Sequence, residues 1–517
     1  MSQAPSEAAF AQEGPGSNLW ETLLGATGTT TGVTARKDRT PCLVEAFLAE
    51  LSPARALVLW VGPAALRRFT TRRALAQLLA RDIARIDDAL SAQVNAILHH
   101  PRFQRLEASW RGLHYLVGQL EEDQDVKVKV LNVSWKELAR DAERAVEFDQ
   151  SQLFRKVYSE EFGMPGGEPY GVLLGDYEIR HTLGPDHSTD DIALLGSISQ
   201  VAAASFAPFI AAAHPALFGL ESFTQLEGPL HLHRIFEQQD YARWQGLRES
   251  EDSRFVGLVL PRVVVRLPYE DDGSREDRFR FREDVAGPDA GKYLWGNAAY
   301  AFGAVLIRAF QQSGWLAEIR GVQRDQETGG LVTRLAVSSC DTDRPGVAPR
   351  SATEVTIVEE QEKELSDLGF MSLCPCKYSA YSAFYANPSI QKPRDYTELA
   401  AAMNARISAM LQYVLCASRF AHYVKILMQH RVGSFASAQE LQDYLTQWVS
   451  RYVANDASAS PHTRARFPLR EAEIRVSERP DRPGTFQCVL RLLPHYQLDA
   501  VTATVALKTT LETQRTR

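Results

Sequence analysis

The residues that come nearest to a metal or redox site are a His-x-His pair and a Cys-x-Cys pair. His231 and His233 would present two imidazoles on one face of a strand, but no cysteine or carboxylate cluster lies at a ligand spacing from them. Cys374 and Cys376 are separated by one proline, whereas redox and zinc motifs separate their cysteines by two residues. We therefore predict structural or surface roles for all four side chains, and no metal site.

Three further patterns could serve nucleotide or acid-base chemistry, and each is incomplete. The run Gly287-Pro-Asp-Ala-Gly-Lys-Tyr is similar to a phosphate-binding loop, but it is one residue short and no Ser or Thr follows Lys292. Asp176 stands where a predicted strand ends, a place where α/β enzymes keep acids, but it has no visible partner. His99-His100 stands at a helix junction, where capping explains it as well as ligation does. The sequence thus predicts no catalytic residue and no cofactor.

The most regular pattern is an apolar stripe that follows Pro101, a residue typical of a helix start. Large apolar residues recur at steps of three and four, which places them on one face of a helix. We expect this face to be covered, either by the same domain or by a partner. A second amphipathic helix, with apolar residues from Leu75 to Ile97, precedes the first. The stripe is a candidate interface made of Phe103, Leu106, Trp110, Leu113 and Val117.

Length and composition favour a folded protein of two or three domains. The chain has 517 residues, more than one core usually holds, with 45% hydrophobic and 23% charged residues. Its net charge of -7 argues against a general nucleic-acid-binding protein. Six scattered cysteines fit reduced thiols in a cytosol better than a disulfide framework. The N-terminal residues show no secretory signal.

One stretch must be weighed as a membrane span. Residues 192–220 contain no charged side chain and are long enough to cross a bilayer. They are nevertheless rich in alanine and interrupted by serine, proline and histidine, so they are too weakly apolar to enter lipid strongly. We expect a helix buried inside a large domain and no direct membrane insertion.

Alternating strand and helix patterns predict an α+β, or mixed α/β, multi-domain fold. The N-terminal region is helical, residues 126–133 alternate like a strand, and the C-terminal part has helices followed by β-strands. We divide the chain into a flexible N-terminal arm and linker (1–70), a middle α/β domain (71–370) and a C-terminal domain (371–517).

Two features of the C-terminal part are further candidate interfaces. A long predicted helix over residues 395–430 carries a basic stripe at three-residue steps, and a predicted strand near the chain end carries apolar residues on one face. A strand in that position could pair with a strand of a neighbouring molecule. The residues concerned are Arg419, His422 and Lys425 in the stripe and Val501, Ala503, Val505 and Leu507 in the strand.

Several separated segments carry a family resemblance. They include His99-x-Pro-x-Phe-x-x-Leu-Glu-x-x-Trp-Arg-Gly-Leu, Gly171-Val-Leu-Leu-Gly-Asp-Tyr, Tyr293-Leu-Trp-Gly-Asn-Ala-Ala-Tyr-Ala-Phe, Ser418-Arg-Phe-Ala-His-Tyr-Val-Lys and Leu493-Pro-His-Tyr-Gln-Leu. In these segments, and in others between residues 80 and 508, the chain resembles the large subunit of the bacterial type VI secretion contractile sheath, the TssC/VipB family. Residues 41–75 match that family poorly.

The resemblance implies a structural, assembling protein and not an enzyme. Such a subunit would pair with a small, TssB/VipA-like sheath subunit, and the heterodimers would stack into a helical sheath on a baseplate, around an inner tube of Hcp-like rings. The resemblance also implies contraction that propels the tube, recycling by a ClpV-like ATPase, strand exchange between neighbouring subunits and a location in the bacterial cytoplasm. It implies no cofactor.

Two other classes of protein stay open. One is a cytosolic enzyme whose site is assembled from distant residues such as Asp176 and His231. The other is a membrane-associated component that uses residues 192–220.

Overall fold

The computed structural model divides into two compact units, residues 1–98 with 269–283 and residues 99–268 with 284–517. The described residues are 43–68, 71–121, 126–164, 166–184, 187–276, 279–285, 290–322, 326–337, 351–376, 379–431, 437–456, 459–478, 486–495 and 505–510. Residues 1–42, which make up most of the predicted arm and linker (1–70), lie outside them.

The first unit is helical, and three of its helices lie in the segment predicted as a flexible arm and linker (1–70). Its helices are α2 (Leu43–Ala49), α3 (Pro53–Val61), α4 (Pro63–Leu66) and the 27-residue α5 (Arg72–Leu98). The ring of Phe47 lies 5.3 Å from that of Trp60, whose Nε1 donates to Asp82 at 3.1 Å. None of α2, α3 and α5 contains a buried residue. The amphipathic helix expected from Leu75 to Ile97 is confirmed as α5, with its apolar side chains only partly covered.

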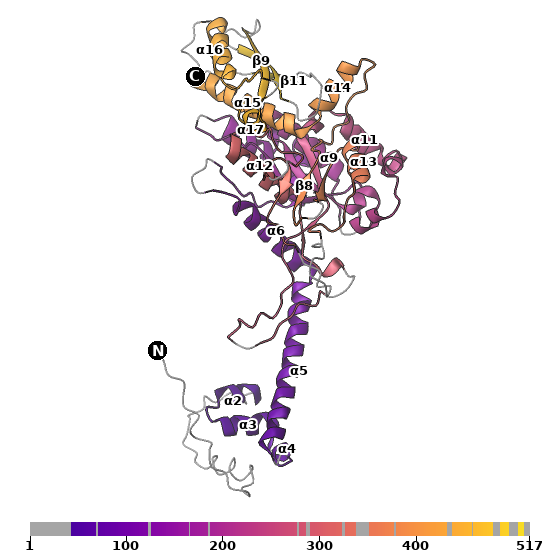
Figure 1. Cartoon of the computed structure of the whole chain (residues 1–517), viewed down its shortest axis with the longest axis vertical. Helices are drawn as coiled ribbons and strands as arrows, with labels where there is room; N and C mark the ends of the chain where they lie inside the picture. Colours follow the sequence, from indigo (N-terminus) through magenta and orange to yellow (C-terminus); the bar gives the residue numbers. More distant parts are fainter. Residues whose placement is uncertain are drawn as a thin grey trace. The chain divides into compact units, whose positions relative to one another are not determined.

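The second unit is built on a six-stranded mixed sheet of order β1-β2-β3-β7-β8-β6. Figure 1 labels β8 of this sheet together with the helices α9 and α12. The strands are β1 (Leu173–Ile179), β2 (Phe209–Ala213), β3 (Val256–Leu260), β6 (Leu331–Val332), β7 (Phe370–Pro375) and β8 (Ser382–Phe384). The first four in this order are parallel, and β8 is antiparallel to both β7 and β6. The predicted domain boundary at residue 370 falls where β7 begins, and the three-part division stays a prediction.

Helices cover both faces of this sheet, which is why its central strands are continuous apolar runs. Side chains of β2 alternate between two cores: Phe209 packs with α9 (Asp191–Ser205) and α11 (Ala242–Glu249), and Ile210 packs with α12 (Ala299–Ser313). Residues 192–220 thus form most of α9 together with β2, inside the protein. The α+β class is confirmed.

Short elements connect this framework. They are α7 (Trp135–Arg144), η1 (Phe148–Gln150), α8 (Gln152–Phe154), the π-helix η2 (Arg155–Phe162), η3 (Pro215–Phe218), η4 (Phe223–Glu227), α10 (Leu232–Phe236), η5 (Gln239–Tyr241), η6 (Asp252–Phe255), β4 (Val263–Val264), η7 (Ala290–Lys292), β5 (Trp295–Gly296) and α13 (Glu359–Asp367). The strand predicted over 126–133 is wrong for this chain: the segment has no strand partner among the described residues.

The C-terminal part adds helices and a three-stranded antiparallel sheet of order β11-β10-β9. Its elements are α14 (Leu399–Ser408), α15 (Leu411–Arg431), α16 (Ala438–Ser450), α17 (Pro461–Arg466), β9 (Leu469–Glu478), β10 (Phe486–Pro494) and β11 (Val505–Thr510). The single helix predicted over 395–430 is wrong. It is interrupted after Ser408 because Ala409 O and Leu411 N bond to the backbone of Ser389 and Asn387.

Small residues let α6 (Pro101–Val117) approach α12 closely. A Cβ atom on Gly112 would lie 2.5 Å from Cε2 of Tyr300, and one on Gly303 would lie 2.8 Å from Cδ1 of Leu116. Real Cβ atoms do not come so near to other heavy atoms. At Gly303 the leucine ends can shift, whereas at Gly112 the rigid Tyr300 ring leaves room only for glycine.

We predict that Gly112→Val destabilises the chain by about 1–3 kcal/mol, because the branched side chain would collide with the Tyr300 ring. The measurement is the free energy of unfolding in urea. Gly246→Ala is the matched control, since Gly246 is also helical and nothing lies within 4 Å of the added Cβ. The control should be neutral or slightly stabilising. Equal stability of Gly112→Val and the wild type would contradict the packing described.

Candidate functional site

The apolar stripe of α6 points away from the core. Leu106 is 56% exposed and Trp110 66% exposed, and the residues of α6 that are buried are Ala108, Gly112 and Leu116. The other stripe residues are exposed at Phe103 and Val117 and half-buried at Leu113. The helix itself is confirmed, with His100 as its N-cap: Nδ1 accepts from Arg102 N at 3.3 Å. The sequence predicted that either the same domain or a partner covers the stripe. Among the described residues, nothing in the same domain covers it.

Polar bonds fix this orientation of α6. Glu107 lies 2.7 Å from Nε of Arg266, and both side chains are nearly buried. Ser109 donates to Asp176, and Tyr115 Oη donates to the carbonyl of Thr333 at 2.8 Å. Asp176 lies in the middle of β1, so the expectation that it stands at a strand end is wrong. Turning the helix to bury its large side chains would break these bonds and leave buried charges unpaired, which is costly.

Arginines flank the stripe on the exposed side of α6. Arg102 and Arg105 are exposed, whereas Glu107, the only acidic residue of the helix, is turned inward to Arg266. Arg111 also pairs with Glu107, at 2.7 Å. The outward face is therefore apolar along its centre and basic along its edges.

The first unit carries exposed apolar side chains of its own. On α5, Ile83 and Ile97 are each 58% exposed, and Ile86 and Leu90 are exposed as well. On α2, Leu48 is 75% exposed. Monomeric soluble proteins seldom leave so many large apolar residues uncovered, so this unit also has the character of an interaction surface.

The basic stripe of α15 does not form a surface. His422 and Lys425 are buried and Arg419 is half-buried. Lys425 Nζ lies 3.3 Å from the Phe162 ring centroid and donates to Tyr158 Oη at 3.1 Å, and the Arg419 guanidinium stacks 4.2 Å from the Phe310 ring centroid. The expectation of a partner-facing basic stripe is wrong here, because η2 and α12 cover that side of the helix.

Burial shifts the pKa of two of these groups. It lowers the pKa of Lys425 to about 8. It also lowers the pKa of His422 to about 4, an effect that the charges of Arg419 and Lys425 strengthen and the hydrogen bond from Nε2 to Ser205 O opposes. His422 is therefore a neutral, buried hydrogen-bond donor at neutral pH.

The predicted terminal strand is found in part. Val505 and Leu507 lie in β11, which pairs antiparallel with β10 of the same chain, with Leu507 opposite Leu490. Val501 and Ala503 lie outside the described residues. β11 stands at one edge of its sheet, so a further strand can add beside it.

The side chains considered for metal binding or catalysis are dispersed. His233 lies in the short helix α10 and not in a strand, and both His231 and His233 are exposed. Cys374 is buried, and burial raises its pKa to about 12. Lys292 pairs with Asp284 at 2.7 Å. In the part of the chain that the structure describes, no three His, Cys, Asp or Glu residues are grouped to hold a metal ion.

Asp176 serves the packing of α6. Burial raises its pKa, although hydrogen bonds with Ser109, Tyr300 and Asn297 act in the opposite direction. The acid thus joins β1 to α6 and α12, which is a structural role.

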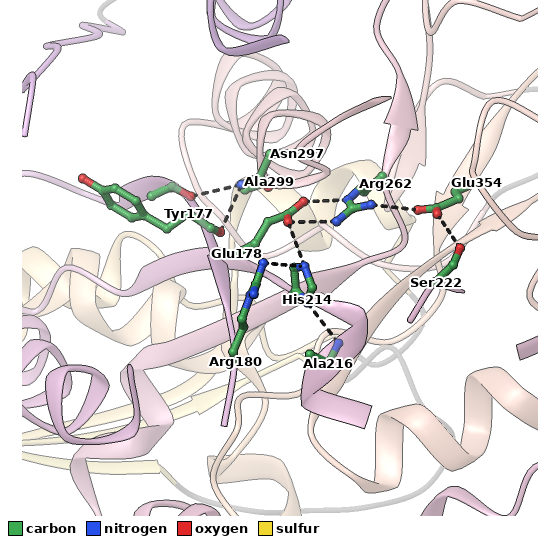
Figure 2. Close-up of polar contacts among 11 residues, drawn as sticks. Tyr177, Glu178, Arg180, His214, Ala216, Ser222, Arg262, Asn297, Ala299 and Glu354 are labelled. Atoms are coloured by element: carbon green, nitrogen blue, oxygen red, sulfur yellow. Dashed lines mark hydrogen bonds and ion pairs between the residues drawn. The ribbon is translucent and has the colours of Figure 1, made fainter. Parts of the chain in front are cut away.

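A polar network lies at the carboxyl ends of the parallel strands, where α/β proteins bind ligands (Figure 2). Arg262 bonds Glu178 through two nitrogen atoms at 2.6 and 2.9 Å and lies 3.8 Å from Glu354, which accepts from Ser222 at 3.0 Å. His214 Nε2 lies 3.8 Å from Glu178 and 2.9 Å from Arg180. These groups contact one another across β1, β2 and β3, which is the arrangement of a structural clamp.

The charges in this clamp compensate each other. Burial alone would raise the pKa of Glu178, but the bonds to Arg262 and its charge bring it below the ordinary value. Burial lowers the pKa of His214 to about 4.

No helix in the described ranges combines the length and apolar character needed to span a bilayer.

Two family models match the chain in succession. The first, the EvpB/VC_A0108 tail sheath N-terminal domain, matches residues 80–391, and the second, the tail sheath gpW/gp25-like domain of the same family, matches residues 400–511. The chain belongs to this tail sheath family. The division between the two family domains falls just before α14, after the six-stranded sheet is complete.

Two known proteins are similar to this tail sheath chain to different degrees. The type VI secretion system sheath protein TssC1 of Pseudomonas aeruginosa is 42% identical over 428 residues, which cover 82% of this chain and 84% of that protein. A chain of the cryo-EM structure of the anti-feeding prophage baseplate has 10% identity and a TM-score of 0.34, covering 76% of this chain and 81% of that one. A likeness at that TM-score carries no inference about function.

We predict that mild acid destabilises the sheath chain in part through His422. A histidine with a folded pKa of about 4 binds its proton more readily when unfolded, so stability falls as the pH drops from about 6.5 towards 4, by up to about 1.4 kcal/mol per pH unit. Urea unfolding of His422→Gln should show a flatter pH profile than the wild type. A wild-type slope in His422→Gln would contradict the assignment.

Proposed function

We propose that this chain is the large subunit of a type VI secretion contractile sheath and that α6 is where it grips a small sheath subunit. The observation that carries the proposal is the apolar stripe of α6, held outward by buried polar bonds in a chain of the tail sheath family. A protein with this surface needs a permanent partner, because exposed stripes of this size lead to aggregation.

The geometry of the stripe defines what fits it. Steps of three and four residues between large apolar side chains form the seam of a coiled coil, so the complementary surface is another amphipathic helix. The exposed Arg102 and Arg105 favour acidic residues beside the partner's apolar stripe. The exposed apolar residues of α5 offer more surface of the same kind. We assign both surfaces to the small sheath subunit.

Contacts between copies would build the sheath from these heterodimers. The free edge of β11 and an extended segment elsewhere on a neighbour are two different surfaces, and repeated contacts between different surfaces generate rings or open helices. In this proposal the sheath stands on a baseplate in the bacterial cytoplasm, surrounds an Hcp-like tube and is recycled by a ClpV-like ATPase.

The work of such a sheath is mechanical. Contraction would draw on two packings of the same subunits that differ in free energy, and it needs no bound cofactor. Acids and bases of the sheet and of α6 have structural partners, as in the Glu178–Arg262 pair and the Asp176–Ser109 bond. We therefore propose that the chain is not an enzyme.

We predict that Trp110→Ala weakens binding to the small subunit by about 30-fold or more, since buried tryptophans dominate interface energies. The melting temperature of the isolated chain should barely change, because the side chain is 66% exposed there. Isothermal titration calorimetry and differential scanning fluorimetry provide the two readouts.

Leu399→Ala is the matched control for Trp110→Ala, because Leu399 is 75% exposed and lies on α14. It should affect neither binding nor stability. Unchanged affinity in Trp110→Ala would refute the assignment of α6, and a large loss of stability would show that the stripe is buried within the chain.

A further inference from the structure

Residues 126–133 have the alternating sequence of a β-strand, but they form no helix and pair with no strand among the described residues. Across the described chain, no backbone N–H or C=O of residues 126–132 makes a hydrogen bond, and Val133 O accepts one only from the side chain of Tyr177, at 2.7 Å. Folded proteins pair almost all of their backbone polar groups unless water does so. Among the described residues, this run of open groups is therefore available to a strand from outside the chain.

Side chains hold this segment in place and leave its backbone open. Lys127 pairs with Glu168, and Lys129 Nζ lies 2.6 Å from Glu161 Oε1 and 5.4 Å from the Tyr170 ring centroid. Next to these anchored lysines, Val130 is 69% exposed and Leu131 is 55% exposed. Val126, Val128 and Val133 are half-buried. The segment is thus fixed in place while Val130 and Leu131 stay uncovered, which is how an acceptor for strand addition is pre-organised.

We propose that residues 126–133 are the site at which a β-strand of the small sheath subunit adds to this chain. The proposal rests on the proposed function and extends it from a helix contact to a second, backbone-mediated contact. A strand is the ligand that the segment fits, because only another extended backbone can satisfy a row of N–H and C=O groups. Its side chains would cover Val130 and Leu131.

The small subunit is the occupant because the segment continues the α6 surface. α6 ends at Val117 and the segment begins at Val126, so fully extended chain allows at most about 30 Å between them. One partner body can therefore span both. The arginines beside the stripe favour an acidic partner, and the same partner would bring its strand to Val126–Val133. A second copy of this chain is the competing occupant that the experiment must exclude.

Proline substitution tests the proposal, because proline removes the backbone N–H that a ladder needs and fits an extended chain. In a strand, successive N–H groups point to opposite edges. Single prolines at Val128 and Val130 therefore probe one edge, and prolines at Lys129 and Leu131 probe the other. Each variant is matched by alanine at the same position, which removes the side chain and keeps the N–H.

The readouts are the affinity of the full chain for the purified small subunit and the melting temperature of the chain alone. We expect one of the two proline pairs to lose affinity by about tenfold or more relative to its alanine controls, while the other pair stays close to them. All melting temperatures should match those of the alanine variants, since residues 126–132 make no backbone hydrogen bond among the residues that the structure describes.

Other outcomes overturn the proposal. Equal affinities in all four proline variants would mean that no ladder forms, and lowered melting temperatures would mean that the backbone is already paired in the free chain. Normal heterodimers that fail to build sheaths would assign the segment to a second copy. A wild-type chain that does not bind the small subunit would refute the proposed function itself.

Discussion

The docking of α6 is the constraint on which the exposed surface of this protein depends. Glu107 and Arg266 pair within the protein, and Gly112 allows the helix to approach Tyr300 more closely than any other residue would. Breaking a buried ion pair costs several kcal/mol, far more than burying one further leucine returns. The large side chains of α6 are consequently held in solvent. One face of the helix carries small residues that contact its own core. Another face carries the apolar stripe, which is open to another molecule.

Polar side chains in the interior are also paired with one another. Glu178 and Arg262 at the strand ends, Asp176 under α6, and Lys425 against Phe162 are groups that could serve chemistry in an enzyme. Here each connects elements that are distant in sequence. A subunit that transmits force benefits from such connections, because they keep the sheet and its helices together while contacts between subunits change.

Much of this architecture follows from local patterns. The two amphipathic helices, the burial of residues 192–220 and the terminal strand were predictable because periodicity acts over a few residues. The orientation of α6 was not, since periodicity identifies an apolar face without saying which molecule covers it. Arg266 lies 159 residues from Glu107, and no spacing rule connects them.

Two errors have the same origin in long-range contacts. The basic stripe of Arg419, His422 and Lys425 resembles a solvated helix face until Phe162 and Phe310 supply aromatic rings for its cations. The break between α14 and α15 comes from backbone bonds to Asn387 and Ser389, not from a proline or glycine in the helix. The strand pattern of 126–133 is real in the sequence, but the chain alone contains no described partner for it.

Electron microscopy of the chain expressed with and without its small subunit tests the central claim, that this protein is a building block of a sheath. Co-expression should give long tubules, and the chain alone should give none. Monodisperse single particles in both preparations, with no tubule at any concentration, would contradict the account.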